Sequence, residues 1–218
     1  MKKTHDLSQS NSVAHDYMKV LRNVVTQNNR ERFRLNVKKL GMMLGFELSK
    51  SLSYSNERIE TPLEEMDHPG ISDDVVVITI LRAGLPLHEG IVEVFPECDQ
   101  GFVSAYRKHE DDGFRIELEY VACPSIEGKV LILNDPMLAT GRSMIDTWKM
   151  LLQFGQPKHT HIVSVIASEE GVSYVQDNAP GDYDLWVGAI DSKLNENKYI
   201  VPGLGDAGDL AFGPKLQH

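Results

Sequence analysis

The chain has 218 residues, of which 41% are hydrophobic and 25% charged, and its formal net charge is −10 at pH 7. This length and balance are typical of a globular protein with one substantial core, so we expect a single domain over residues 1–218. The negative charge disfavours binding to nucleic acid or to anionic lipid, because both partners are polyanions.

Two features indicate where the protein works. Cys98 and Cys123 lie far apart in the sequence, and we expect free thiols rather than a disulfide framework. The first residues, MKKTHDLSQSNSVAHDYM, contain two lysines but no apolar segment, which is not the pattern of a secretory signal. No stretch approaches the roughly 20 apolar residues of a membrane span. We therefore expect a cytoplasmic protein that does not bind membranes.

The first quarter of the chain is predicted to be largely helical. Its first dozen residues are polar, and we expect them to be loosely held. Residues 13–52 lack proline and repeat apolar residues at helical spacing, which predicts two helices with a break near residues 26–29. Residues 53–74 are polar and turn-rich, with Pro62, Pro69 and Gly70.

From Val75 onward, strand and helix patterns alternate. The run VVVITI has six consecutive β-branched residues, which is typical of a strand covered on both faces in a parallel sheet. The other predicted strands are GFVSAYRKH, FRIELEYVA, KVLILND, THIVSVIAS and DLWVGAID, and the predicted helices are LPLHEGIVEVF, MIDTWKMLLQFG and EEGVSYVQDN. The tail KYIVPGLGDAGDLAFGPK has little helix or strand character. This alternation predicts an α/β fold with a mostly parallel sheet, whose ligands lie at the carboxyl ends of the strands.

The loop after Asn134 has the chemistry of an anion site. Ala139, Thr140 and Gly141 are small enough to let backbone amides approach a ligand, and the helix that follows points its positive end into the same space. Asp135 offers an acceptor for sugar hydroxyls or for a hydrated magnesium ion. We read residues 137–143 as a turn that enters a helix and holds a ribose phosphate. The pattern is not that of a P-loop, and on spacing alone an ordinary strand–turn–helix with an Asp/Thr cap is equally compatible.

Three stretches then resemble one family in the order that the family has them. The family is that of the uracil phosphoribosyltransferases. Its phosphate loop is similar to VLILNDPMLATGRSM, its loop near the diphosphate to ILRAGLPLHEGIVEVFP, and its base loop to YIVPGLGDAGDLAFG. AYRKHE and IASEEGV are shorter matches. The resemblance implies the phosphoribosyltransferase fold, a mostly parallel central sheet flanked by helices, with a β-arm, an N-terminal helical region over residues 1–52, and a core with the base-binding loop over residues 75–213.

The resemblance also implies the reaction and the residues that serve it. Uracil and 5-phosphoribosyl 1-diphosphate would give uridine monophosphate (UMP) and diphosphate, in pyrimidine salvage. The implied phosphoribosyl-diphosphate contacts are Arg82, Arg107, Asp135, Pro136, Met137, Leu138, Ala139, Thr140, Gly141, Arg142, Ser143 and Asp206. The implied uracil contacts are Ile200, Gly205, Asp206 and Ala207, largely through backbone groups. Arg82, Asp135 and Asp206 are implied to be catalytic, by positioning and electrostatics without a covalent nucleophile.

The implied cofactor is Mg²⁺, held through the substrate, water and Asp206, with no direct protein ligand assigned. The implied assembly is a homodimer or a higher homo-oligomer, and GTP is an effector of some relatives. Each residue also has a simpler interpretation: Arg82 could pair with a nearby carboxylate, Arg107 could be a solvated charge, and Asp206 could be a turn residue.

Arg142 is the main departure, because typical members carry glycine there. If this position needs φ > 0, arginine costs on the order of 1 kcal/mol. Either the guanidinium adds a cation to the phosphate site, or it turns away and only the backbone N–H serves; we favour the second. Glu169, Leu210 and Pro214 also differ from the family pattern, and Asn134 replaces an acid found in many phosphoribosyltransferases.

These departures keep a second hypothesis open, a catalytically weak or inactive nucleotide-sensing regulator of RNA with the same fold. The net charge argues against it, because phosphate contacts need clustered Lys and Arg. A third hypothesis, a same-fold enzyme that acts on a purine, is disfavoured by the loop YIVPGLGDAGD.

Overall fold

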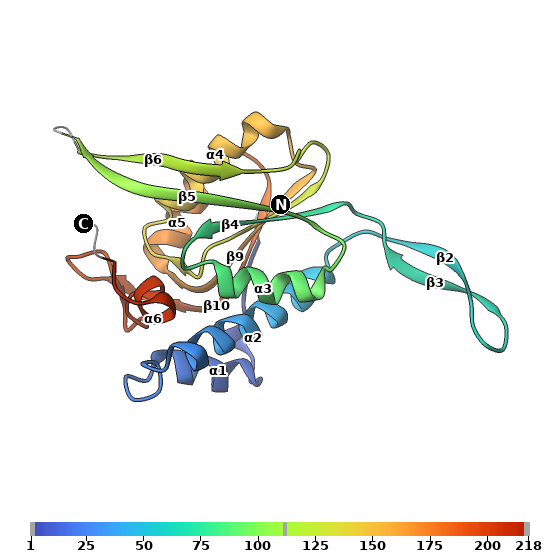
Figure 1. Cartoon of the computed structure of the whole chain (residues 1–218), viewed down its shortest axis with the longest axis horizontal. Coiled ribbons are helices and arrows are strands. Elements are labelled where there is room, and N and C mark those ends of the chain that lie inside the picture. Colours follow the sequence, from blue (N-terminus) through green and yellow to red (C-terminus); the bar gives the residue numbers. More distant parts are fainter. Residues whose placement is uncertain (1–2, 111–112, 216–218) are drawn as a thin grey trace.

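An eight-stranded sheet forms the centre of the molecule in this computed structural model, which describes residues 3–110 and 113–215, with side chains described outside 105–119 (Figure 1). The strand order is β1-β10-β9-β7-β4-β5-β6, and the short β8 also pairs with β9. All pairs are parallel except β5 with β6. The strands are β1 Lys3–Asp6, β4 Val75–Leu81, β5 Asp99–Glu110, β6 Gly113–Ala122, β7 Val130–Asn134, β8 Met137–Leu138, β9 His159–Ser168 and β10 Tyr183–Asp191.

Helices cover both faces of this sheet, which confirms the α/β prediction. One face packs on α1 (Ala14–Arg22), α2 (Arg30–Ser49) and α3 (Leu85–Val94), and the other on α4 (Arg142–Leu151) and α5 (Glu169–Asn178). Along β4 the side chains alternate between the two cores, Val75 and Val77 to one and Val76 and Ile78 to the other. A strand with apolar neighbours on both faces has no polar alternation, which explains the unbroken apolar runs.

The two predicted N-terminal helices are α1 and α2. The side chain of Asn29 caps α2 by accepting a hydrogen bond from the backbone N–H of Arg32 at 2.9 Å. α2 lies across α3 (Figure 1), and their backbones come very close, since a Cβ on Gly41 would sit 2.6 Å from the carbonyl oxygen of Leu87. Only glycine allows this approach, so α2 is held tightly against the helix that follows β4.

The first residues are not loosely held as expected. β1 adds to the edge of the sheet beside β10, and the ring of His5 stacks on Trp186 with centroids 3.7 Å apart. The pairing depends on backbone groups and on one distant tryptophan, so a polar local sequence gave no sign of it. The short 3₁₀ helix η1 (Leu7–Gln9) follows.

Residues 53–74 form strands rather than a series of turns. β2 (Tyr54–Glu60) and β3 (Glu65–Ile71) pair as an antiparallel hairpin that projects from the body (Figure 1), the β-arm that the resemblance implied. Both strands are exposed along nearly their whole length. A ribbon with no buried face lacks the period-2 apolar pattern that predicts strands, which explains why the sequence reading missed it.

The tail also has more regular structure than expected. β11 (Lys193–Leu194) pairs with β12 (Ile200–Val201), and α6 (Ala207–Phe212) follows. Earlier in the chain, the short 3₁₀ helix η2 (Leu152–Phe154) follows α4. The Asp206 side chain caps α6 by accepting from the backbone N–H of Asp209 at 2.9 Å. These elements are shorter than a periodic pattern can reveal. Across the part of the chain described here, no helix is both long and apolar enough to cross a bilayer.

Candidate active site

A cavity of about 360 Å³ opens at the carboxyl ends of β4 and β7. Three segments line it together: residues 80–83 at the end of β4, Asp135, Met137 and Ser143 after β7, and the tail at residues 197–199, 206–208 and 215. The parallel pairing of β4 with β7 brings the first two loops side by side, which is the position expected for a ligand in such a sheet.

Two buried side chains lock the ends of these strands. The Thr79 hydroxyl donates to Asn134 Oδ1 at 2.7 Å, and Asn134 Nδ2 donates to the carbonyl oxygen of Ile78 at 3.0 Å. Both residues are fully buried, so a carboxylate in place of Asn134 would be a charge removed from water. The amide therefore suits this position, and the pair sets the loops of Arg82 and Asp135 at a fixed spacing. The sequence reading did not identify Thr79, because its partner is 55 residues away.

Arg82 leaves the end of β4 and reaches the tail. Its Nη2 donates to the carbonyl oxygen of Gly213 at 3.2 Å and lies 3.5 Å from Asp209 Oδ1. Its Nε is buried and has no protein partner among the residues described. The predicted carboxylate pairing is therefore present, and the guanidinium remains partly exposed in the lining of the cavity.

Asp135 is the strongest electrostatic feature of the cavity. Its carboxylate accepts from the backbone N–H of Met137 at 3.2 Å. Removal from water raises the pKa of Asp135 to about 7, and the nearby Asp206 carboxylate raises it further, against the effect of the Met137 bond. The side chain keeps some exposure to the cavity, so a ligand can reach it. A carboxyl group with this pKa exchanges its proton near neutral pH.

The phosphate-side loop, residues 139–141, differs from the predicted turn at both ends. Met137 and Leu138 form β8, which pairs with β9, and α4 begins at Arg142. Gly141 takes the positive φ, 72°, and Arg142 is the first helical residue, so the expected strain at Arg142 is absent. The Arg142 guanidinium lies over the ring of Tyr174 at 5.4 Å. The side chain therefore packs on Tyr174, and the Arg142 backbone N–H at the helix start donates to the Thr140 hydroxyl at 3.5 Å.

The tail loop is anchored by the N-terminal helix α1. Arg22 makes a bidentate ion pair with Asp191, at 2.7 and 2.8 Å, and also donates to the carbonyl oxygen of Gly203 at 3.0 Å. Asp191 accepts from the backbone N–H of Gly203 at 2.8 Å, and Gln27 donates to the carbonyl oxygen of Leu204 at 2.9 Å. These supports were missed by the sequence reading. Arg22 and Asp191 are 169 residues apart, and no local pattern joins them.

The structure brings most of the predicted site residues together. The main cavity is lined by six of them: Arg82, Asp135, Met137, Ser143, Asp206 and Ala207. Leu138, Ala139, Thr140 and Gly141 line an adjoining hollow of about 50 Å³ that shares Asp135, Met137 and Ser143 with it. Thr140 and Ala207 therefore line two neighbouring hollows on the same side of the molecule, which share Asp135, Met137 and Ser143.

Other predicted residues lie elsewhere. Pro136 is buried, and its carbonyl oxygen accepts from the N–H groups of Val165 and Ile166. The Ile200 side chain packs in the core, so its predicted contact with uracil through backbone groups stays a prediction. Gly205, with φ 92°, is exposed beside the cavity without lining it. Arg107 lies on β5, and its side chain is outside the described residues.

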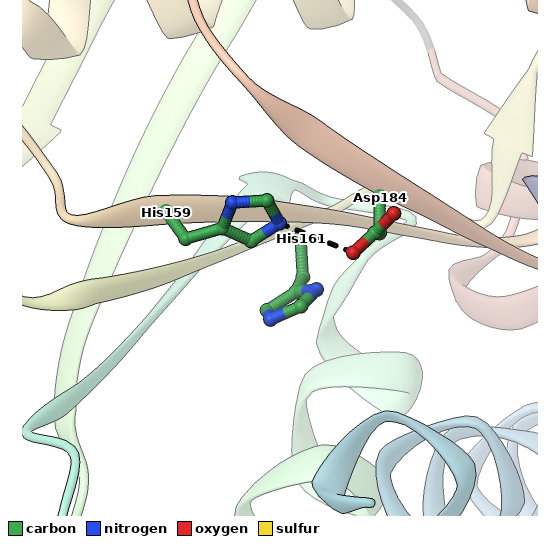
Figure 2. Close-up of side chains that lie close together, drawn as sticks. All are labelled: His159, His161 and Asp184. Carbon is green, nitrogen blue, oxygen red and sulfur yellow. Dashed lines mark hydrogen bonds and ion pairs between the residues drawn. The ribbon is translucent and has the colours of Figure 1, made fainter. Parts of the chain in front are cut away.

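A second polar cluster lies at the other end of the parallel strands, where β9 and β10 begin (Figure 2). His159 Nε2 is 3.2 Å from Asp184 Oδ2, and the three ligand atoms of His159, His161 and Asp184 lie within 4.8 Å of one another. However, His161 Nδ1 accepts from the indole N–H of Trp186 at 3.1 Å. Burial lowers the pKa of His161 to about 3, so the ring is neutral with its proton on Nε2. Its lone pair is already used, so we assign the cluster a structural role.

Comparisons with known proteins agree with this geometry. The family model for uracil phosphoribosyltransferase matches residues 8–214. A uracil phosphoribosyltransferase from Porphyromonas gingivalis is 47% identical over 211 residues, which cover 96% of this chain and 98% of that protein. One from Methanococcus maripaludis is 43% identical, covering 88% and 83%, and one from Pyrococcus furiosus is 40% identical, covering 85% and 81%.

Solved structures give the same result for the fold. A protein from Aquifex aeolicus has a TM-score of 0.87 at 28% identity, covering 98% of this chain and 99% of that chain. A hypoxanthine phosphoribosyltransferase from Staphylococcus aureus has a TM-score of 0.51 at 16% identity, covering 84% and 83%, and so shares the fold alone. With a family match that spans nearly the whole chain, the chain belongs to the uracil phosphoribosyltransferase family.

Proposed function

We propose that the cavity joins uracil to 5-phosphoribosyl 1-diphosphate and releases UMP and diphosphate, a step of pyrimidine salvage. The observation that carries this proposal is the shared lining of one cavity by the phosphate-side loop, by Arg82 and by the tail loop. Its volume of about 360 Å³ is in the range of small-molecule sites. A sugar phosphate can lie on the first loop while a flat base reaches the third.

The site residues divide the work by the charge that each offers. Breaking the bond between ribose C1 and the diphosphate oxygen builds positive charge on the sugar and negative charge on the leaving group. The partly exposed Arg82 guanidinium lines the cavity and pairs with the diphosphate, and the ionised Asp135 accepts hydrogen bonds from the ribose hydroxyls. Backbone N–H groups at the start of α4 face the 5-phosphate, where the helix end favours an anion.

We further propose that Mg²⁺ accompanies the diphosphate. The carboxylates of Asp135 and Asp206 line the same cavity and interact strongly enough for Asp206 to raise the pKa of Asp135. Two neighbouring carboxylates offer the oxygen ligands that Mg²⁺ prefers, directly or through water. Asp206 already uses one oxygen to cap α6, so its second oxygen is the one available. When bound, the ion would neutralise negative charge on the leaving group.

The proposal is tested by measuring diphosphate release with five bases in parallel: uracil, cytosine, hypoxanthine, guanine and orotate. We expect release with uracil and Mg²⁺, and none after chelation of the metal. Release with hypoxanthine or guanine instead of uracil would assign the site to purines. A lack of uracil-dependent release at every Mg²⁺ concentration would contradict the proposal.

We propose that the protein is a homodimer and that the β2–β3 hairpin is part of the interface. Leu63 at the hairpin tip is 95% exposed, and Tyr54, Met66 and Ile71 along the ribbon are also exposed. An isolated two-stranded ribbon is marginally stable in water, so cover from a second copy would stabilise it. Light scattering should give the mass of a dimer for the wild type and of a monomer for Leu63→Glu with Met66→Glu. Glu64→Gln, on the same tip, is the control and should remain dimeric.

Activation by GTP and a cytoplasmic location stay predictions of the resemblance and of the sequence. GTP activation is checked by adding GTP to the uracil assay at a sub-saturating concentration of phosphoribosyl diphosphate. A rate that does not change at any GTP concentration would remove GTP from the list of effectors.

A further inference from the structure

The turn between β11 and β12 holds a lysine in an unusual backbone conformation. Lys198 has φ 63°, and in the described part of the chain it is the single residue other than glycine with positive φ. The turn is closed on both sides by Asn195, whose Oδ1 accepts from the N–H groups of Asn197 at 3.0 Å and of Tyr199 at 2.9 Å. Lysine is disfavoured in the left-handed region, and such conformations persist mainly where the surroundings impose them, often at functional sites.

This conformation places Lys198 at the wall of the candidate active site. The residue lines the main cavity together with Asp135 and Ser143. Its ammonium lies 3.7 Å from Glu170 Oε1, and both side chains are about half exposed, at 53% and 54%. An ion pair with this exposure is weak, so the lysine can leave Glu170 at little cost.

Glu170 belongs to the side of the cavity that holds the phosphate loop. It lies in the first turn of α5, and that turn packs directly behind the loop. A Cβ on Gly171 would be 2.5 Å from the carbonyl oxygen of Ala139, and one on Gly141 would be 2.8 Å from the carbonyl oxygen of Gly171. The Lys198 ammonium is therefore paired with the helix turn that packs behind the loop on which the sugar 5-phosphate rests in the proposed function.

The cavity lining has two further cations, Arg82 and the exposed Lys215, and Arg142 lies nearby at the start of α4. The Arg82 guanidinium is held toward the tail by Asp209 and Gly213, on the diphosphate side. Arg142, at the start of α4, points to Tyr174. Lys198 differs from Arg82 in that it pairs with Glu170 in the first turn of α5, and its flexible four-carbon stem lets the ammonium change partners.

We propose that Lys198 is a ligand-binding residue, whose ammonium leaves Glu170 and pairs with the 5-phosphate when the site fills. The inference rests on the proposed function, because the 5-phosphate is shared by phosphoribosyl diphosphate and UMP. Glycine or asparagine would suit the left-handed backbone conformation at position 198 better, but neither could offer the phosphate a positive charge.

The test measures binding of UMP and of diphosphate separately, by calorimetry. Lys198→Asn keeps a residue that tolerates the left-handed turn and removes the charge. We expect its Kd for UMP to rise at least about tenfold, as for loss of a charge-assisted hydrogen bond, with diphosphate affinity unchanged. Its melting temperature should rise, because the strain is relieved. Lys198→Arg should retain most of the UMP affinity, and Glu170→Gln should bind UMP more tightly than the wild type.

Lys193→Asn is the matched control, since Lys193 lies on the same hairpin, is exposed and does not line the cavity. Wild-type UMP affinity in Lys198→Asn, or an equal loss in Lys193→Asn, would overturn the inference. An equal loss of UMP and diphosphate affinity would overturn the assignment to the 5-phosphate. The uracil assay of the wild type tests the proposed function independently, and a wild type that fails to bind UMP would contradict both.

Discussion

The side-chain hydroxyl of Ser168 donates a hydrogen bond to the carbonyl oxygen of Ala139 at 2.6 Å. The Ser168 hydroxyl oxygen also accepts a hydrogen bond from the backbone N–H of Gly171 at 2.9 Å. Ser168 ends β9, caps α5 and is fully buried, so one hydroxyl joins the sheet, the helix and the phosphate-side loop. The loop is therefore held in place from behind before any ligand arrives.

Replacement of Ser168 by alanine should loosen this loop. The change leaves the Ala139 carbonyl and the Gly171 N–H without partners in a buried place, which costs about 1–2 kcal/mol of unfolding free energy. We expect KM for phosphoribosyl diphosphate to rise severalfold, with KM for uracil much less affected, in steady-state assays. Ser164→Ala on the same strand is the control. The Ser164 hydroxyl is buried with no partner among the described residues, so its loss should change neither quantity.

Asp135→Asn should lower activity and raise stability at alkaline pH. Because the folded-state pKa of about 7 lies above the usual 3.8, the carboxyl destabilises the fold increasingly as pH rises from 3.8 to 7, and fully above 7. Asparagine keeps the acceptor for the Met137 N–H but carries no charge. Urea unfolding at pH 8 should show a gain on the order of 2 kcal/mol, and the gain should vanish near pH 4.

The same group gives the reaction a pH dependence. Asp135 must be ionised to stabilise positive charge on the ribose, so kcat/KM should rise with pH through about 7 in the wild type. The residual kcat/KM of Asp135→Asn should not show this rise with pH. If kcat/KM of the mutant rises with pH through about 7 as it does in the wild type, another group is responsible for the rise.

His161 should make the fold sensitive to acid. Its folded pKa of about 3 is below the usual 6.5, so the unfolded chain binds a proton that the folded protein does not. The stability from the neutral ring is complete above pH 6.5 and falls as pH drops from 6.5 towards 3. Between pH 7 and pH 5 the loss should be about 2 kcal/mol by urea unfolding.

His161→Gln keeps an acceptor for Trp186 and should reduce this slope by about one proton. His68→Gln, on the exposed hairpin, is the control and should leave the slope unchanged. An unaltered slope in His161→Gln would show that the acid sensitivity does not come from His161.

Arg142→Ala should leave ligand binding almost unchanged. The guanidinium lies over Tyr174, and the backbone N–H that faces the loop is retained in alanine. We expect KM for phosphoribosyl diphosphate within about twofold of the wild type and a stability loss of about 0.5–1 kcal/mol. Tyr174→Leu should cost a similar amount, and the double mutant should lose less than the sum. A tenfold rise in KM would instead make Arg142 a direct phosphate ligand.

Several elements follow from local sequence. The runs of β4, β7 and β9 are apolar on both faces because helices cover both faces, and this burial is visible as unbroken β-branched and apolar stretches. The helix α5 matches its predicted range because Ser168 is a strong cap and two glutamates occupy the first turn. Asp135, Arg82 and Asp206 were predicted for one site, and they line one cavity.

Other features depend on partners far away in the chain. β1 exists because β10 offers a free edge, and the tail loop is held by Arg22 through Asp191. The positive φ of Gly141, rather than of position 142, follows from β8 pairing with β9 just before it. No local window contains both members of these pairs.

The sequence by itself determined the layered α/β fold, the family and the three loops that carry the chemistry, because burial and close backbone approach restrict residue types locally. Only the tertiary structure decided the direction of each side chain: Arg142 towards Tyr174, Lys198 into the cavity, and Ile200 into the core. Those directions are set by contacts between segments that meet only when the chain folds, so they cannot be read from the spacing of residues along it.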